Sequence, residues 1–121
     1  MVNANELLFG LDTFGDMGSD SAGKPLTAAQ TIRNLVEQAK FADELGIHAI
    51  NVGEHHRDDF SVSAPDTVLA GIATVTKNII LGTGVTVLSS DDPVRVYQRF
   101  ATVDALSNGR AEITAGRGSF T

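Results

Sequence analysis

Glu54, His55 and His56 form a candidate catalytic or metal-binding cluster in this sequence. A histidine titrates near neutral pH, so either imidazole could act as a general acid or base. The pair could also bind a metal ion, but adjacent residues at a strand end project in opposite directions, which disfavours one shared ion. A structural alternative stays open, in which these side chains only satisfy one another and the loop backbone.

A second candidate is the segment Gly116-Arg117-Gly118-Ser119, which combines a fixed cation, two glycines and a hydroxyl. The glycines permit close approach to the backbone, and an arginine suits a phosphate or a carboxylate group. The alternative is an ordinary turn after a strand, whose arginine pairs with a nearby carboxylate. These residue types predict an anion-binding turn and leave the structural turn open.

Two glycine-rich segments resemble nucleotide-binding motifs without meeting their requirements. Residues 18–25, GSDSAGKP, nearly match a Walker A loop, but Pro25 replaces the hydroxyl residue that would hold magnesium. Gly82 and Gly84 lack the third glycine of a dinucleotide-binding fingerprint. Glycines inside a strand still indicate close approach to the backbone, either by a flat ligand or by packing or a bulge.

The elements that must position these residues are four short runs typical of β-strands. These runs cover residues 7–11, 49–52, 79–85 and 111–115. A helical pattern lies in each interval between them, so the predicted order is β-α-β-α-β-α-β. Residues 13–26, rich in Gly, Asp and Ser, are predicted to form a long loop.

The first helical pattern begins with the capping-box sequence Thr27-Ala-Ala-Gln30 and ends before Gly46. Its apolar positions at helical spacing are Ile32, Leu35, Val36, Ala39, Ala42 and Leu45.

The other two helices are predicted from an N-cap residue followed by an early proline. Ser63 is the expected N-cap of the second helix, with Pro65 in its first turn. Asp92 is the expected N-cap of the third helix, with Pro93 at the first helical position. Their apolar positions are Val68, Leu69 and Ile72 in the second helix, and Val94, Tyr97, Ala101 and Ala105 in the third.

Helices that connect consecutive strands make the sheet parallel, so the loops after the strands gather at one edge. Glu54, His55 and Arg117 would therefore surround a common crevice. Four such units form either a small open sheet or the first half of a (βα)8 barrel, which has about 250 residues. Periodicity alone does not choose between them. Because the chain stops just after the fourth strand, at residues 119–121, before any covering helix, we interpret it as a fragment.

Composition excludes several classes of protein. The 121 residues, with 42% hydrophobic and 20% charged, predict one globular domain over residues 1–121. A formal net charge of -6 disfavours a broad nucleic-acid or anionic-membrane surface. The sequence has no cysteine, and no apolar run approaches the ~18 residues of a membrane helix. We therefore expect a cytoplasmic protein without nucleic-acid or membrane partners.

Taken together, these segments resemble the bacterial luciferase-like family of flavin-dependent monooxygenases, which are (βα)8 barrels. The likeness spans nearly the whole chain. Its most specific segments are VGEHH at residues 52–56, LGTGVTVL at 81–88, DPVR at 92–95, SNGR at 107–110 and AGRG at 115–118.

The resemblance implies a role for each candidate residue around a flavin. It places His55 beside the flavin as the proton-transfer group, with Glu54 and His56 in support. A non-proline cis peptide under the isoalloxazine ring is implied at Gly84–Val85, and a phosphate-binding arginine is implied at Arg117.

Gly116, also implied in cofactor binding, stands where luciferase proper has a cysteine, so the resemblance does not extend to light emission.

The function implied by the resemblance is oxidation of a small organic substrate by reduced FMN and dioxygen. A separate reductase would supply the reduced flavin, because no nicotinamide-binding fingerprint is present. One alternative is an F420-dependent oxidoreductase of the same superfamily. Another is a noncatalytic half-barrel that assembles with itself or with another subunit through its exposed sheet edge. We expect the protein to form a homo-oligomer.

Overall fold

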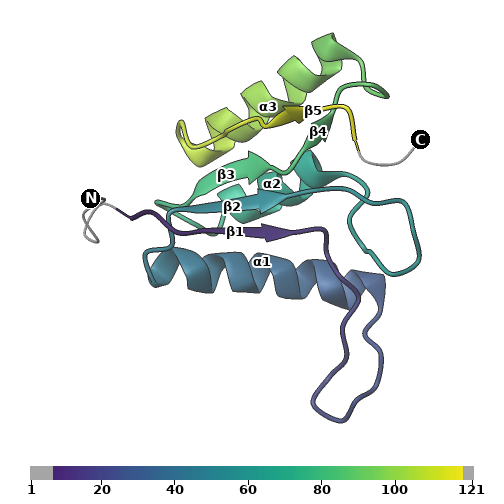
Figure 1. Cartoon of the computed structure of the whole chain (residues 1–121). Coiled ribbons are helices and arrows are strands. Elements are labelled where there is room, and N and C mark those ends of the chain that lie inside the picture. Colours follow the sequence, from purple (N-terminus) through teal and green to yellow (C-terminus); the bar gives the residue numbers. More distant parts are fainter. Residues whose placement is uncertain (1–6, 119–121) are drawn as a thin grey trace.

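The computed structural model describes residues 7–118, along which strands and helices alternate (Figure 1). The strands are β1 (Gly10–Thr13), β2 (Ala49–Val52), β3 (Ile80–Thr83), β4 (Thr86–Val87) and β5 (Ala115–Gly116). Strands β1, β2 and β3 form a parallel sheet in that order, and β4 pairs in parallel with β5. A parallel bridge between Leu81 and Ala111 connects the two sheets. The predicted parallel α/β repeat is confirmed.

Three helices pack in chain order against the strands: α1 (Ala28–Glu44), α2 (Pro65–Ala73) and α3 (Pro93–Ser107). Helix α2 contacts both other helices, while α1 runs along the β1 side and α3 beside β4 and β5 (Figure 1). Alternate strand residues such as Ile50, Val52 and Leu81 are buried with Leu69 and Ile72 of α2. Within residues 7–118, no helix combines the length and apolar character needed to cross a bilayer.

Three of the four predicted strands have wrong bounds. The first strand begins at Gly10 rather than Leu7, because its pairing starts where Gly10 meets Ala49. The third expected strand is divided into β3 and β4. The expected fourth strand, residues 111–115, is interrupted in the same way. Ala111 pairs with Leu81 of β3 through a single bridge, and continuous pairing resumes only where Ala115 meets Thr86 of β4, so β5 is short.

The predicted caps of α1 and α3 are confirmed, and that of α2 is wrong. Thr27 Oγ1 accepts a hydrogen bond from Gln30 N at 3.3 Å, and Thr27 N donates to Gln30 Oε1 at 3.0 Å. Asp92 Oδ1 accepts from Arg95 N at 3.0 Å. In α2 the N-cap is Ala64, which has no capping side chain, so Pro65 alone marks the start.

The apolar face predicted for α3 is the exposed one. Val94 and Tyr97 are 62% and 73% exposed, whereas Val96 and Phe100 are buried. Both stripes have helical spacing, and contact with α2 selects the one that contains Phe100. Periodicity alone could not distinguish the two faces, because each carries apolar residues at compatible positions.

The side chain of Asn51 explains why β3 contains Gly82. A Cβ atom at Gly82 would lie 2.2 Å from Asn51 Oδ1, so the neighbouring strand's amide occupies this space. Asn51 Nδ2 also donates to Asp12 Oδ1 at 2.9 Å, across β1 and β2. At Gly82, the packing interpretation therefore applies and the flat-ligand interpretation does not.

A buried arginine, Arg110, fixes the opposite end of the strands. Its guanidinium donates five hydrogen bonds, which reach the Ser107, Ala73, Thr76 and Ile79 carbonyl oxygens and Thr76 Oγ1. It therefore joins the end of α2, the start of β3 and the turn after α3. The sequence analysis assigned no role to this residue.

Asp43 at the end of α1 holds the same edge from the other side. Its carboxylate accepts hydrogen bonds of 2.7–2.8 Å from the backbone N–H groups of Lys77, Asn78 and Ile79. Burial alone would raise the pKa of Asp43, but these three donors and the charge of Arg110 outweigh it and lower the pKa.

Candidate functional site

The loops at the carboxyl ends of the strands surround a cavity of about 950 Å³. All of the residues predicted for the site line it: Glu54, His55, His56, Gly84, Val85, Gly116 and Arg117. The prediction that these loops share one edge is therefore confirmed, while the chemical roles stay predictions. Ser119, the hydroxyl residue of the predicted anion turn, lies outside the described residues.

His55 packs against two aromatic rings, which also contact each other edge-to-face. Its ring centroid is 4.2 Å from that of Phe14, after β1, and 4.7 Å from that of Phe60, in the loop before α2. His55 N also donates to Val62 O at 3.4 Å. These contacts fix the position of the imidazole at the cavity wall.

Glu54 and His56 form a separate pair. His56 Nε2 lies 3.6 Å from Glu54 Oε1, and the two side chains are 67% and 20% exposed. His55 and His56 thus have different neighbours, as expected for adjacent residues that project apart. Over residues 7–118, no group of three or more His, Cys, Asp or Glu side chains is placed to hold a metal ion.

The peptide bond between Gly84 and Val85 is cis, at the position that the family resemblance implies. Gly53 lies directly beside it. A Cβ at Gly53 would be 2.5 Å from Gly84 O and 2.4 Å from Phe14 Cε1. The absence of a side chain at Gly53 therefore allows Phe14 to reach its place against His55.

The Gly116–Arg117 turn is held by the segment that follows β4. Leu88 N donates to Gly116 O at 2.8 Å, and Ser89 Oγ donates to Arg117 O at 2.6 Å. A Cβ at Gly116 would lie 2.6 Å from Val85 Cγ2, so the backbone here packs closely on Val85. Among residues 7–118, no ion pair joins Arg117 to a carboxylate, and the anion-binding role of this turn stays a prediction.

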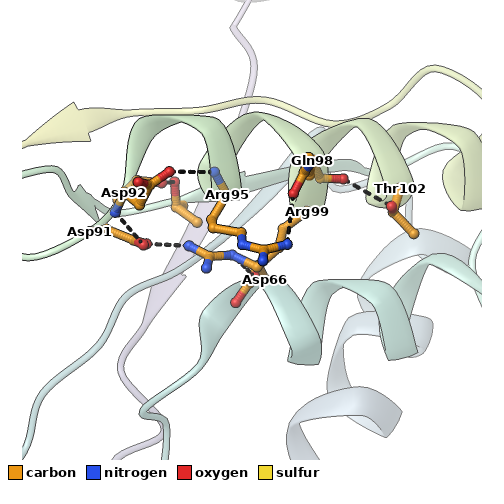
Figure 2. Close-up of polar contacts among 9 residues, drawn as sticks. Asp66, Asp91, Asp92, Arg95, Gln98, Arg99 and Thr102 are labelled. Atoms are coloured by element: carbon orange, nitrogen blue, oxygen red, sulfur yellow. Dashed lines mark hydrogen bonds and ion pairs between the residues drawn. The ribbon is translucent and has the colours of Figure 1, made fainter.

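A smaller polar cavity of about 160 Å³ lies beside the main one and shares Glu54 and Val87 with it. Arg99 of α3 lies there between two carboxylates, those of Asp66 in α2 and Asp91 in the loop before α3 (Figure 2).

Sequence reasoning did not single out several residues of this region. The missed residues are Phe60, Ser89, Asp66, Asp91 and Arg99, which lie in or next to the two cavities. Phe60 stands only five residues after His55, but loop sequences have no periodicity that would place it on the imidazole. The partners of Arg99 come from separate elements, so no local motif could reveal them.

The fold is a parallel (βα) repeat with a cavity at the carboxyl ends of its strands, and comparison of the sequence with protein families identifies which family it represents. Residues 12–121 match the model of the family described as luciferase-like monooxygenase. The chain belongs to this family, which confirms the resemblance inferred from its motifs.

Two relatives of known activity align with most of this chain. The oxygenase component of flavin-dependent trigonelline monooxygenase from Acinetobacter baylyi is 35% identical over 96 residues, which cover 78% of this chain and 27% of that protein. N-acetyl-S-alkylcysteine monooxygenase from Bacillus subtilis is 34% identical over 96 residues, which cover 78% and 29% of the two chains. The chain thus spans less than a third of either relative.

Solved structures show the same fold. The oxygenating constituent of 3,6-diketocamphane monooxygenase from Pseudomonas putida, in complex with FMN, matches with a TM-score of 0.82 at 23% identity, over 94% of this chain and 30% of that one. Coenzyme F420-dependent tetrahydromethanopterin reductase from Methanopyrus kandleri matches with a TM-score of 0.67 at 23% identity, over 94% and 28%. The chain has the architecture of a partial TIM barrel, as predicted.

Proposed function

We propose that the protein containing this chain is a flavin-dependent monooxygenase, in which reduced FMN and dioxygen oxidise a small organic substrate. The observation that carries the proposal is the meeting of His55 and Arg117 at one cavity, although 61 other residues separate them in the sequence. The flavin-dependent relative and the FMN-bound structural neighbour support this choice of cofactor.

The residues around the cavity fit a flavin mononucleotide. Its volume of about 950 Å³ is at the upper end of the usual range for small-molecule sites, ~300–1,000 Å³. Gly84 and Gly116 leave main chain uncovered along one wall, and a Cβ at Gly116 would clash with Val85. Arg117 supplies a fixed positive charge for a phosphate in a chain whose net charge is -6.

Each residue then has a distinct task. Arg117 binds the phosphate, and the Gly84–Val85 segment with Gly116 supports the ring system. His55, packed against Phe14 and Phe60, moves a proton at its imidazole during substrate oxidation. The flavin itself, when bound in its reduced form, supplies the electrons for dioxygen.

Reduced flavin is proposed to come from a separate reductase. The Acinetobacter relative is named as an oxygenase component, which supports this arrangement. The sequence also lacks a nicotinamide-binding fingerprint, although its glycines Gly82 and Gly84 are close together.

Parallel titrations with reduced FMN and reduced F420 under anaerobic conditions test the proposal. We expect binding of FMN in the micromolar range and at least about tenfold weaker binding of F420, which corresponds to about 1.4 kcal/mol. Consumption of dioxygen should then follow FMN binding. Tighter binding of F420 would instead favour the F420-dependent alternative, and binding of neither would contradict a cofactor role for this cavity.

A second candidate, noncatalytic assembly through exposed apolar surface, is favoured by one observation. Leu8 and Phe9 are 71% and 66% exposed, and Tyr97 is 73% exposed. Sedimentation of the purified protein with and without FMN separates the two functions. An oligomer that binds no flavin would support assembly alone, whereas flavin binding at any oligomeric state supports the enzyme.

A further inference from the structure

Arg99 of α3 connects two elements that are far apart in sequence (Figure 2). Its Nε forms an ion pair with Asp66 Oδ2 at 2.5 Å, and its Nη2 donates a short hydrogen bond to Asp91 Oδ2. Asp66 lies in the first turn of α2, and Asp91 lies in the loop between β4 and α3. One guanidinium therefore joins α2, α3 and this loop.

This arrangement is more than an isolated surface pair. The side chain of Asp66 is only 13% exposed, and that of Asp91 is 30% exposed. Both carboxylates touch the same cation, so removal of Arg99 would leave two like charges near each other in a partly buried space. Exposed ion pairs contribute little to stability, but a partly buried bridge between two acids restrains the elements that carry them.

The loop that contains Asp91 also holds the predicted phosphate-binding turn. Two residues before Asp91, Ser89 Oγ donates to Arg117 O at 2.6 Å. Leu88 N donates to Gly116 O at 2.8 Å from the same side. The main chain at Arg117 is thus attached to the segment that Arg99 anchors.

We propose that Arg99 is a positioning residue for anion recognition: through Asp91 and Ser89, it sets the placement of Arg117 at the main cavity. The proposal rests on the proposed function, because it takes Arg117 to bind the phosphate of FMN. An arginine recognises a phosphate through a planar fork of donors, so its main chain must be held in one orientation. Arg99 supplies this restraint without contacting the ligand.

The test compares the affinities for FMN and riboflavin, which differ only in the phosphate. Riboflavin affinity reports the ring site, whereas the ratio of the two dissociation constants reports the phosphate contact. All measurements use the full-length protein. We expect Arg117→Ala to reduce the preference for FMN by about tenfold, as for loss of a hydrogen bond to a charged group.

For Arg99→Ala we expect a fall in the preference for FMN of about three- to tenfold, with riboflavin affinity changed less than about twofold. In the double variant with Arg117→Ala, the preference should equal that of Arg117→Ala alone, because both changes remove the same contact. Arg99→Lys should recover little, since one compact ammonium nitrogen replaces the two separate nitrogens, Nε and Nη2, that reach Asp66 and Asp91.

Arg95→Ala is the matched control. Arg95 lies one turn earlier in α3, and its Nη1 donates to Gln98 Oε1, within the same helix, at 3.0 Å. The change removes the same charge from the same helix, so the preference for FMN should stay at the unaltered value. A loss as large as that of Arg99→Ala would show a general charge effect and overturn the positioning role.

Ser89→Ala provides a second route that leaves the ion pairs intact and should also reduce the preference for FMN. If Arg99→Ala does not fold, the preference of Ser89→Ala for FMN over riboflavin tests the positioning role instead. If the unaltered protein binds FMN no better than riboflavin, the proposed phosphate site itself is wrong. If it prefers FMN and both Arg99→Ala and Ser89→Ala keep that preference, the positioning role is wrong while the flavin site stands.

Discussion

Replacement of Gly53 by alanine should destabilise the protein at the centre of the candidate site. The added methyl group would lie 2.4 Å from Phe14 Cε1 and 2.5 Å from Gly84 O. Both distances are far below ordinary van der Waals contact, so atoms on two sides must move. The carbonyl belongs to the main chain, which yields less easily than a side chain.

The cost follows from this geometry. Forcing an extra methyl into a close-packed site costs about 1–3 kcal/mol of unfolding free energy. Phe14 is a side chain and can shift more easily than the main chain. Its ring centroid lies 4.2 Å from that of His55, however, so a shift of Phe14 displaces the imidazole. We therefore expect Gly53→Ala to lose stability in this range and to lose oxidation activity.

Gly71→Ala is the matched control for this prediction. Gly71 lies inside α2, where an added Cβ would meet only Val36 Cγ2 at 4.0 Å, an ordinary contact. Alanine should therefore stabilise the helix by about 0.5–1 kcal/mol through its higher helix propensity. Urea unfolding of both variants measures the difference, which we expect to be about 1.5–4 kcal/mol.

Equal stability of the Gly53→Ala and Gly71→Ala proteins would refute the steric argument. A second check combines Gly53→Ala with Phe14→Ala. In the Phe14→Ala background, Gly53→Ala should cost less stability than in the unaltered protein, because the clash with the ring is gone, but it should still destabilise, because the clash with Gly84 O remains.

Three further predictions concern other positions. Arg110→Met should lower the unfolding free energy by about 3–5 kcal/mol, measured by urea unfolding, because several buried carbonyl groups lose their donor. Asp43→Asn should reduce stability at pH 6, and by progressively less as the pH falls below 3.8, measured by urea unfolding at several pH values: the lowered pKa of Asp43 stabilises the fold above its ordinary value of 3.8, and this contribution is lost as the pH falls through the folded-state value. His55→Ala should keep FMN affinity within about threefold while slowing substrate oxidation by about 10²-fold or more, because proton transfer is lost and the phosphate contact stays.

The elements that local chemistry specifies could be predicted from the sequence. Thr27 and Gln30 form their capping box within one turn, so nothing distant is needed to place the start of α1. The strand-to-loop alternation likewise places His55 and Arg117 at one edge, because parallel strands leave no other arrangement for the loops that follow them.

Features that depend on packing between separate elements could not be predicted. The buried face of α3 is selected by α2, so Phe100 is inside and Tyr97 is outside although both fit a helical stripe. Arg99 finds its two aspartates in other segments, and Phe60 reaches His55 through an irregular loop. Such contacts leave no signature in the residues next to them.

The hydrogen bonds of Arg110 end almost entirely on carbonyl oxygens of the main chain. Every amino acid carries this acceptor, so the side chains at positions 73, 79 and 107 can change during evolution without removing a partner of the guanidinium. The side chains that specify this junction are therefore few: Arg110, its one side-chain acceptor Thr76, and Asp43 on the other side. A lineage could therefore vary the three side chains within the limits of core packing and keep the junction, provided that Arg110, Thr76 and Asp43 are retained.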